Sequence, residues 1–169
     1  MLGIHGLDRF GLAHAVIGIA ALVLGLVVIA QGKGSASHRV WGSAYVVAMV
    51  LLNASALAIY DVSGRFNTFH LFALLSLATV AAGWIPALLR RPAARWYERH
   101  AIYMAWSYVG LAAALVSEIV TRIPAFQVRA LIGATVAVST LGVVAIGALV
   151  IRRRVPRLVS RFSATSASR

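Results

Sequence analysis

The sequence predicts an all-α fold: an integral membrane up-down helical bundle of five transmembrane helices with a four-helix core. Its 169 residues are 61% hydrophobic and only 12% charged, which is too apolar for the exposed face of a soluble domain. Apolar runs of about 20 residues recur, and a helix of that length crosses a bilayer core roughly 30 Å thick. The alternating pattern of a membrane β-barrel is absent, so helices are the expected spanning elements.

The expected helices cover residues 10–31, 39–60, 66–89, 97–121 and 126–151. The first is too long for a removable signal peptide, and further spans follow it instead of a cleavage site and a soluble body. The basic, Gly/Ser-rich stretch "GKGSAS" separates the first two helices, Pro86 marks the end of the third, and Pro124 lies in the loop after the fourth. Because the connections are short, consecutive helices should be antiparallel neighbours.

The transmembrane domain is expected to cover residues 1–151, and residues 152–169 form a basic, Ser-rich cytoplasmic tail. The tail begins "RRRVPR" and ends "SATSASR". This composition is typical of a segment that is disordered or lies on the lipid surface.

The orientation follows from the positions of Lys and Arg, which are more frequent in cytoplasmic loops. One side of the expected topology holds Lys33, Arg39, Arg90, Arg91, Arg95, Arg99, Arg152, Arg153, Arg154, Arg157, Arg161 and Arg169. The other side holds Arg9, Arg65, Arg122 and Arg129. We therefore expect the N-terminus outside and the C-terminus in the cytoplasm. Because the net charge of +12 sits in loops and tail, it indicates contact with a lipid bilayer and no nucleic-acid binding.

The residue types that are missing exclude several chemistries. Without cysteine there are no disulfides, thiolate metal sites, iron–sulfur clusters or thiolate haem ligands. The sequence has no Gly-rich phosphate loop, no GxSxG elbow and no HExxH motif. Its acidic residues, Asp8, Asp61, Glu98 and Glu118, are too few to favour hydrolytic acid/base chemistry.

Each of the first four predicted helices has a histidine near its N-terminal end: His14, His38, His70 and His100. Antiparallel connectivity puts His14 and His70 on the outer side and His38 and His100 on the cytoplasmic side. In an up-down four-helix bundle each pair lies on diagonal helices and faces its partner across the core. Two facing histidines are the axial ligands of a bis-imidazole haem, so the pattern predicts one or two b haems forming an electron path.

Residues beside these histidines fit the same hypothesis. Lys33, Arg39 and Arg99 lie near the expected headgroup level and could pair with anionic haem propionates. The face of the first helix beyond His14 carries small residues that admit either a flat macrocycle or another helix. These are Gly18, Ala21 and Gly25.

The fourth predicted helix carries a polar stripe that should face the protein interior or a water-filled path, because lipid exposure is costly. The stripe runs through His100, Met104, Ser107, Leu111, Ala114 and Glu118 on one helix face, and its polar members are the histidine, the serine and the glutamate. Glu118 precedes Arg122 by one turn, which favours a local salt bridge. The alternatives for Glu118 are a proton relay, a quinone-site acid or a metal ligand beside the outer histidines.

Four strings together resemble a family of small bacterial predicted membrane proteins, domain of unknown function 2306, over about residues 10–125. They are "HAVIGIAALVLG", "GKGSASHRVWGSAYVVAM", "NASALAIYDVSGRFNTFHLFALLSLATVAAGW" and "ERHAIYMAWSYVGLAAALVSEIVTR". The resemblance implies a multi-pass protein of the bacterial inner (cytoplasmic) membrane. It brings no activity with it.

The chain also resembles, in architecture, the transmembrane cytochromes of the b561 class. Those proteins bind two b haems with one histidine per helix and move electrons from ascorbate or quinol across the membrane. By position, His14 and His70 would match one haem pair, and His38 and His100 the other. Lys33 and the HR dipeptide resemble the basic loop before a ligating histidine, whereas the short connection from His14 to His38 departs from the class.

Three functions remain open at this point. The leading hypothesis is a b-type haem transmembrane electron-transfer protein; if it is an enzyme, it is a transmembrane oxidoreductase with a quinol- or ascorbate-type donor. The second is a protein that binds or transports zinc, copper or iron, with Glu118 among the ligands beside the four histidines, His14 and His70 above all. The third is a non-catalytic membrane subunit or assembly factor, in a homo-oligomer or a larger complex.

Overall fold

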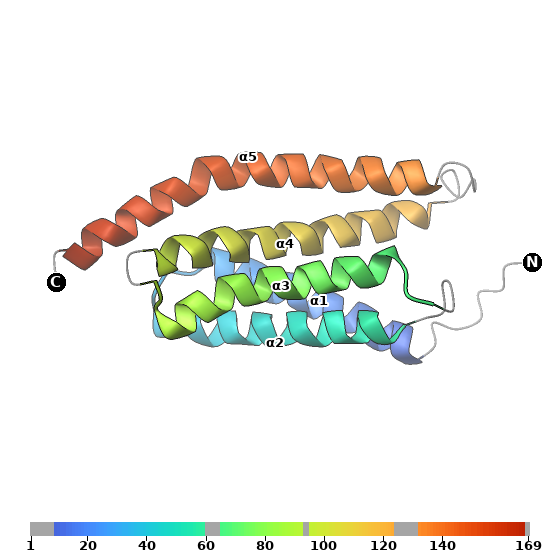
Figure 1. The fold of residues 1–169 in the computed structure, drawn as a ribbon, viewed down its shortest axis with the longest axis horizontal. Helices are drawn as coiled ribbons and strands as arrows, with labels where there is room; N and C mark the ends of the chain where they lie inside the picture. Colours follow the sequence, from blue (N-terminus) through green and yellow to red (C-terminus); the bar gives the residue numbers. More distant parts are fainter. Residues whose placement is uncertain (1–8, 60–64, 93–94, 124–131, 168–169) are drawn as a thin grey trace, which may run out of the picture. The chain divides into compact units, whose positions relative to one another are not determined.

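The structure is a computed structural model and describes residues 9–59, 65–92, 95–123 and 132–167 (Figure 1). Its helices are α1 (Arg9–Ala30), α2 (Ala36–Ala58), α3 (Thr68–Leu89), α4 (Trp96–Thr121) and α5 (Ile132–Ala167). All 5 are long and apolar enough to cross a membrane. The predicted all-α class with five candidate spans is therefore confirmed.

The chain divides into two compact units, residues 1–80 and residues 81–169, with the boundary inside α3. The first unit holds α1, α2 and the beginning of α3, and the second holds the end of α3, α4 and α5. Each unit is described by itself. The expected four-helix core joins helices of both units and stays a prediction.

In the first unit, α1 packs against α2 through the small-residue face beyond His14. Ala21 is completely buried, and a Cβ added at Gly18 would lie 3.4 Å from Leu52 Cδ1, an ordinary van der Waals distance. On α2, Tyr45 and Met49 are buried at 2% and 1% exposure. The small residues of α1 therefore serve close helix–helix packing, one of the two roles expected for them.

The connection between α1 and α2 is held by side chains that cap both helices. Ser35 Oγ accepts a hydrogen bond from the backbone N–H of His38 at 3.0 Å, which starts α2 earlier than the predicted residue 39. Lys33 Nζ donates to the carbonyls of Val28 and Ile29 at 2.9 and 3.0 Å and so satisfies the end of α1. Burial lowers the pKa of Lys33.

In the second unit, α4 and α5 run antiparallel along each other (Figure 1). Ser117 Oγ lies 2.9 Å from Thr140 Oγ1 and 3.3 Å from Ser139 Oγ, which links the helices through hydroxyl groups. Farther along, Gly147 of α5 packs directly against Val109 of α4. Small residues and hydroxyl hydrogen bonds are the usual means of joining helices in lipid.

The end of α3 packs against α4 at Gly83, where a Cβ would lie 2.9 Å from Met104 Sδ. Pro86 lies inside the last turn of α3, which ends at Leu89, the end predicted from the sequence. The helix stops where Arg90 adopts a φ of 50° and the N–H of Arg91 donates to the Pro86 carbonyl at 3.3 Å. This is a Schellman-type ending with arginine where glycine is preferred.

The basic segment after residue 151 is helical, which corrects the expectation of a disordered stretch. α5 runs without interruption to Ala167 and includes Pro156. Val155, Leu158 and Val159 recur at helical spacing among the arginines, and Val155 is 6% exposed, so this segment has one apolar face. A helix with one apolar and one basic face fits the alternative expectation, a segment on the lipid surface. The predicted start of this span at residue 126 lies outside the described residues.

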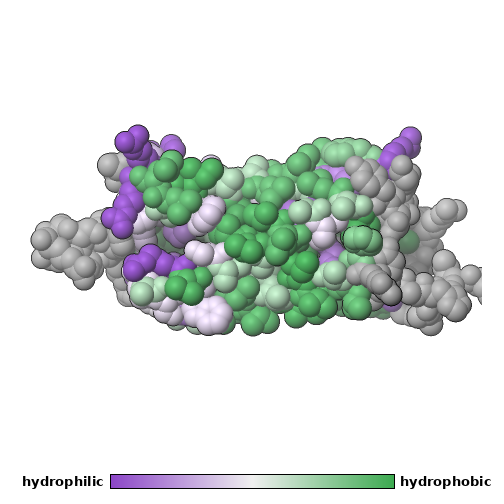
Figure 2. All heavy atoms as spheres, turned by 90° about the horizontal axis from the view of Figure 1, so that it is seen from below, coloured by the Kyte–Doolittle hydropathy of each residue, from purple (hydrophilic) through white to green (hydrophobic). Residues whose placement is uncertain are grey.

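Apolar side chains dominate the helix surfaces. Figure 2 shows a hydrophobic surface over the middle of the helices on the face in view, with hydrophilic side chains gathered toward the helix ends. Phe10 and Val138 are about 70% exposed, at 69% and 71%. Lipid tails are the natural partner of such a surface, since a water-soluble protein rarely exposes so continuous an apolar area.

The glycine contacts generate a stability prediction. In Gly147→Ala the new Cβ would lie 2.5 Å from both Val109 Cγ atoms, and in Gly83→Ala it would lie 3.0 Å from the backbone nitrogen of Met104. Each variant should lose about 1–3 kcal/mol through overpacking. The control Gly142→Ala meets nothing within 4 Å and should gain roughly 0.5–1 kcal/mol because alanine favours helix. Thermal unfolding in detergent measures this; equal midpoints for Gly142→Ala and Gly147→Ala would contradict the packing.

Candidate functional site

His14 is held by a hydrogen-bond chain that reaches from α1 into α2. Its Nδ1 lies 2.8 Å from Ser55 Oγ, and the Ser55 hydroxyl donates to the carbonyl of Leu52 at 2.7 Å. A serine hydroxyl has one hydrogen, so Ser55 must accept from the Nδ1–H of His14. In this neutral tautomer the lone pair of His14 is on Nε2.

His100 is held in the same way between α4 and α3. Its Nδ1 donates to the backbone carbonyl of Gly83 at 2.9 Å. Gly83 has no side chain to keep α4 away. A carbonyl can only accept, so the lone pair of neutral His100 is also on Nε2.

His70 is the most deeply buried of the histidines in the described ranges, at 1% exposure. Its Nδ1 lies 3.0 Å from Asn67 Oδ1 and 3.2 Å from the Asn67 backbone nitrogen, and its ring centroid is 5.1 Å from that of Phe66. Asn67 Oδ1 also accepts from the N–H of Phe69 at 2.9 Å. His70 is thus built into the capped beginning of α3.

His38 lies in the first turn of α2, and its Nδ1 atom is buried. His38 and His100 belong to different units, so their predicted pairing across the core stays a prediction. The two cationic side chains near His38 donate hydrogen bonds to nearby backbone carbonyls. Lys33 donates to carbonyls at the end of α1, and Arg39 Nη1 donates to the Gly34 carbonyl at 3.0 Å. Their predicted pairing with haem propionates likewise remains a prediction.

The stripe on α4 is buried only in its middle, so the expected inward direction is confirmed there, and the expected water-filled path at its far end stays a prediction. Ser107 and Leu111 are 3% and 7% exposed, whereas Ala114 is exposed and Glu118 is 60% exposed. Glu118 forms the expected ion pair with Arg122 one turn later. Within the described ranges, no three His, Asp or Glu side chains come together as a metal site.

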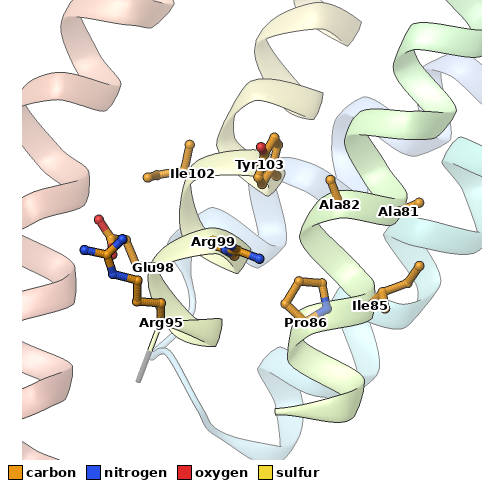
Figure 3. Close-up of a pocket in the computed structure, with 9 residues that line it drawn as sticks. All are labelled: Ala81, Ala82, Ile85, Pro86, Arg95, Glu98, Arg99, Ile102 and Tyr103. Atoms are coloured by element: carbon orange, nitrogen blue, oxygen red, sulfur yellow. The ribbon is translucent and has the colours of Figure 1, made fainter. Parts of the chain in front are cut away.

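A pocket of about 560 Å³ opens between the end of α3 and the beginning of α4 (Figure 3). Sequence reasoning missed it, because Arg95 was considered only for topology, and Arg99 for topology and as a partner of haem propionates. That pairing of Arg99 remains a prediction. The available signal was their helical spacing, which puts them on one face of α4 with Tyr103. The lining residues are Ala81, Ala82, Ile85, Pro86, Arg95, Glu98, Arg99, Ile102 and Tyr103.

Comparison with known proteins assigns the family. The sequence pattern of the family described as "Predicted membrane protein (DUF2306)" matches residues 11–160. The chain belongs to this family. The match confirms the resemblance seen in the sequence and extends it through most of α5. As a DUF2306 member with five candidate spans, the chain is a multi-pass membrane protein.

Among curated proteins and among solved structures, none matches the chain. No comparison shows the likeness to b561-class cytochromes, which depends on the positions of the histidines and of the basic residues Lys33 and Arg39 in this chain.

The exposed ion pair of Glu118 predicts a small energetic role. Glu118→Gln should change the free energy of unfolding by less than about 1 kcal/mol, because solvent screens exposed pairs. Ser117→Ala removes hydroxyl contacts between helices and should cost about as much or more, roughly 0.6–1.7 kcal/mol. Thermal unfolding in the same detergent compares the two. A much larger loss of unfolding free energy in Glu118→Gln would show that Glu118 makes a stabilising interaction in addition to its ion pair with Arg122.

Proposed function

We propose that this DUF2306 protein binds haem b through the histidines of its first four helices and conducts electrons across the membrane. The supporting observation is that His14 and His100 are each fixed through Nδ1 to an oxygen of a neighbouring helix. This arrangement occurs in both units, on different helices and with different acceptors.

Such a contact is what a metal-ligating histidine needs. A ligating imidazole binds the metal with one nitrogen and donates its other N–H to a nearby oxygen, which fixes ring orientation and tautomer. The Nδ1 contacts of His14 and His100 put the lone pair on Nε2, the nitrogen that would ligate. Imidazole without cysteine fits a haem with two histidine ligands, and bound haem supplies one-electron exchange at its iron.

The residues around the histidines would position and protect this group. Ser55 orients the His14 ring, and the Gly83 carbonyl orients the His100 ring. The apolar surroundings exclude water, which is one of the protein's means of tuning a haem potential. The proposal keeps the pairs predicted from the sequence, His14 with His70 and His38 with His100, and a quinol- or ascorbate-type donor.

The first test is the visible spectrum of the purified chain in mild detergent, oxidised and then reduced with dithionite. We expect a sharp α band on reduction, and a pyridine haemochrome assay giving one or two haems per chain. A colourless protein that also fails to take up added haemin would contradict the proposal. Metal analysis of the same sample would then test the transition-metal alternative with Glu118.

The ligand assignment is tested by histidine variants. His14→Ala should remove the haem of one pair and His100→Ala that of the other, so each lowers the haem-to-chain ratio while the remaining haem reports that the protein is folded. The matched control is His5→Ala, a histidine that precedes the first span. Loss of haem in His5→Ala to the same extent would show that the effect is not one of ligation.

Ser55 provides a separate test as a positioning residue. Ser55→Ala removes the acceptor of the His14 Nδ1–H, so haem retention should weaken by about 10–100-fold. The midpoint potential of that haem should shift as well. Ser55→Thr keeps a hydroxyl and should restore both properties. Unchanged retention and potential in Ser55→Ala would rule out a positioning role.

A further inference from the structure

The pocket between α3 and α4 has two chemically different parts. Its α3 side is apolar, formed by Ala81, Ala82, Ile85 and Pro86. Its α4 side carries Arg95, Glu98, Arg99 and Tyr103, with Ile102 adding apolar surface. Figure 3 shows Arg99 extending from α4 toward α3. A ligand that fills such a pocket needs both an apolar portion and an anionic group.

The pocket lining holds two positive charges, Arg95 and Arg99, and one negative charge, Glu98, so its net charge is positive. Arg95 is the N-cap residue of α4, and Arg99 lies four residues later within that helix. Like charges at this spacing repel each other. Among the described residues, neither forms an ion pair or a side-chain hydrogen bond. Figure 3 shows Arg99 on the side of α3 and Arg95 on the opposite side of the beginning of α4, so Arg99 is the group that an anion in the pocket would meet. Guanidinium groups are especially suited to phosphate because they donate two parallel hydrogen bonds.

The second unit is basic over this entire end. Val109 of α4 lies against Gly147 of α5, and the helices are antiparallel. Arg99 precedes Val109 by ten residues and Arg157 follows Gly147 by ten residues. Because the helices are antiparallel, the two arginines lie at about the same level. Arg153 is correspondingly near the level of Tyr103. An end of a membrane protein with this charge attracts anionic lipid headgroups.

Depth within the pocket fits a lipid as well. Tyr103 lies one turn deeper into the span than Arg99 and is 41% exposed. Tyrosine at this level is typical of the membrane–water interface, where its hydroxyl meets polar lipid groups. Ala82 and Ile85 leave an apolar surface beside it for the start of an acyl chain.

We propose that this pocket binds one anionic phospholipid, with its phosphate at Arg99, further positive charge from Arg95 at the same helix end, and its proximal acyl chain along α3. This site goes beyond the haem proposal, since neither the family nor the histidines imply it. Its ligand is identified by a phosphate diester joined to apolar chains. A free phosphate shares only the first of these features.

The test uses native mass spectrometry of the full chain in mild detergent, which counts each lipid as a mass separate from any haem. Dioleoylphosphatidylglycerol and dioleoylphosphatidylcholine are added in turn, since they differ in headgroup charge. We expect one phosphatidylglycerol to be retained about tenfold more tightly than phosphatidylcholine. Equal retention of the two lipids would overturn the proposal.

Variants locate the site. Arg95→Gln/Arg99→Gln should lose the preference for phosphatidylglycerol, whereas Arg152→Gln/Arg154→Gln, which removes equal charge outside the pocket lining, should keep it. Tyr103→Phe removes only the hydroxyl and should weaken retention more mildly, which guards against a misfolded arginine variant. Equal retention by both double variants would overturn the proposal.

A competition experiment with inorganic phosphate distinguishes a site for a phospholipid from a site for a free anion. Inorganic phosphate at the concentration that saturates with phosphatidylglycerol should not displace the lipid, because it lacks the apolar portion. Displacement by phosphate would overturn the lipid assignment. Because haem and lipid are counted separately, failure of this site leaves the haem proposal untouched, and the reverse also holds.

Discussion

The constraint on which this structure depends is the absence of water in the bilayer core. A buried polar group there must find its partner within the protein. The described contacts between helices follow this rule: His14 bonds to Ser55, His100 to the Gly83 carbonyl, and Ser117 to Thr140. Apolar surface alone gives no preference for one helix over another, because lipid tails are equally apolar. The polar contacts therefore fix which helices meet and in which register.

Glycine decides how close these polar contacts can come. The hydrogen bond from His100 needs the backbone of α3 within reach, and Gly83 provides it, since a Cβ would collide with Met104. The same close approach at Gly147 brings α5 against Val109. In the second unit, packing and hydrogen bonding thus depend on the same few small residues, which makes these positions less tolerant of substitution than the apolar surface around them.

The spans were predictable because bilayer thickness limits the length of an apolar run. The observed helices differ from the predicted ones mainly at their ends, where hydrogen bonds from capping residues determine the first or last residue of the helix. α2 starts at Ala36 because Ser35 caps it, and a run of apolar residues gives no sign of that contact. The many arginines after residue 151 led to the prediction of a tail separate from the last helix. Arginine, leucine and valine can all be accommodated in a helix, however, and α5 continues through this segment.

The histidines were also predictable as candidates, because a titratable residue within each of four apolar helices is unusual. Their partners were not. Ser55 is 41 residues from His14, and Gly83 is 17 residues from His100, so these contacts depend on helix crossings that no local pattern specifies. The pocket was missed for a different reason. Arg95 already had an explanation in topology, and Arg99 had one in topology and another in the haem hypothesis, so neither residue called for a pocket as its explanation.

The length of α5 has a mechanical consequence. Its 36 residues extend about 54 Å, so a helix that begins at one face of a roughly 30 Å core must emerge well beyond the other. A continuous helix transmits rotation about its axis, which a disordered chain does not. Any turn of α5 at its contact with Val109 would therefore reorient the arginines from Arg152 to Arg157 at the membrane surface. The orientation of these arginines is therefore coupled, through the continuous helix α5, to the packing of α5 against α4.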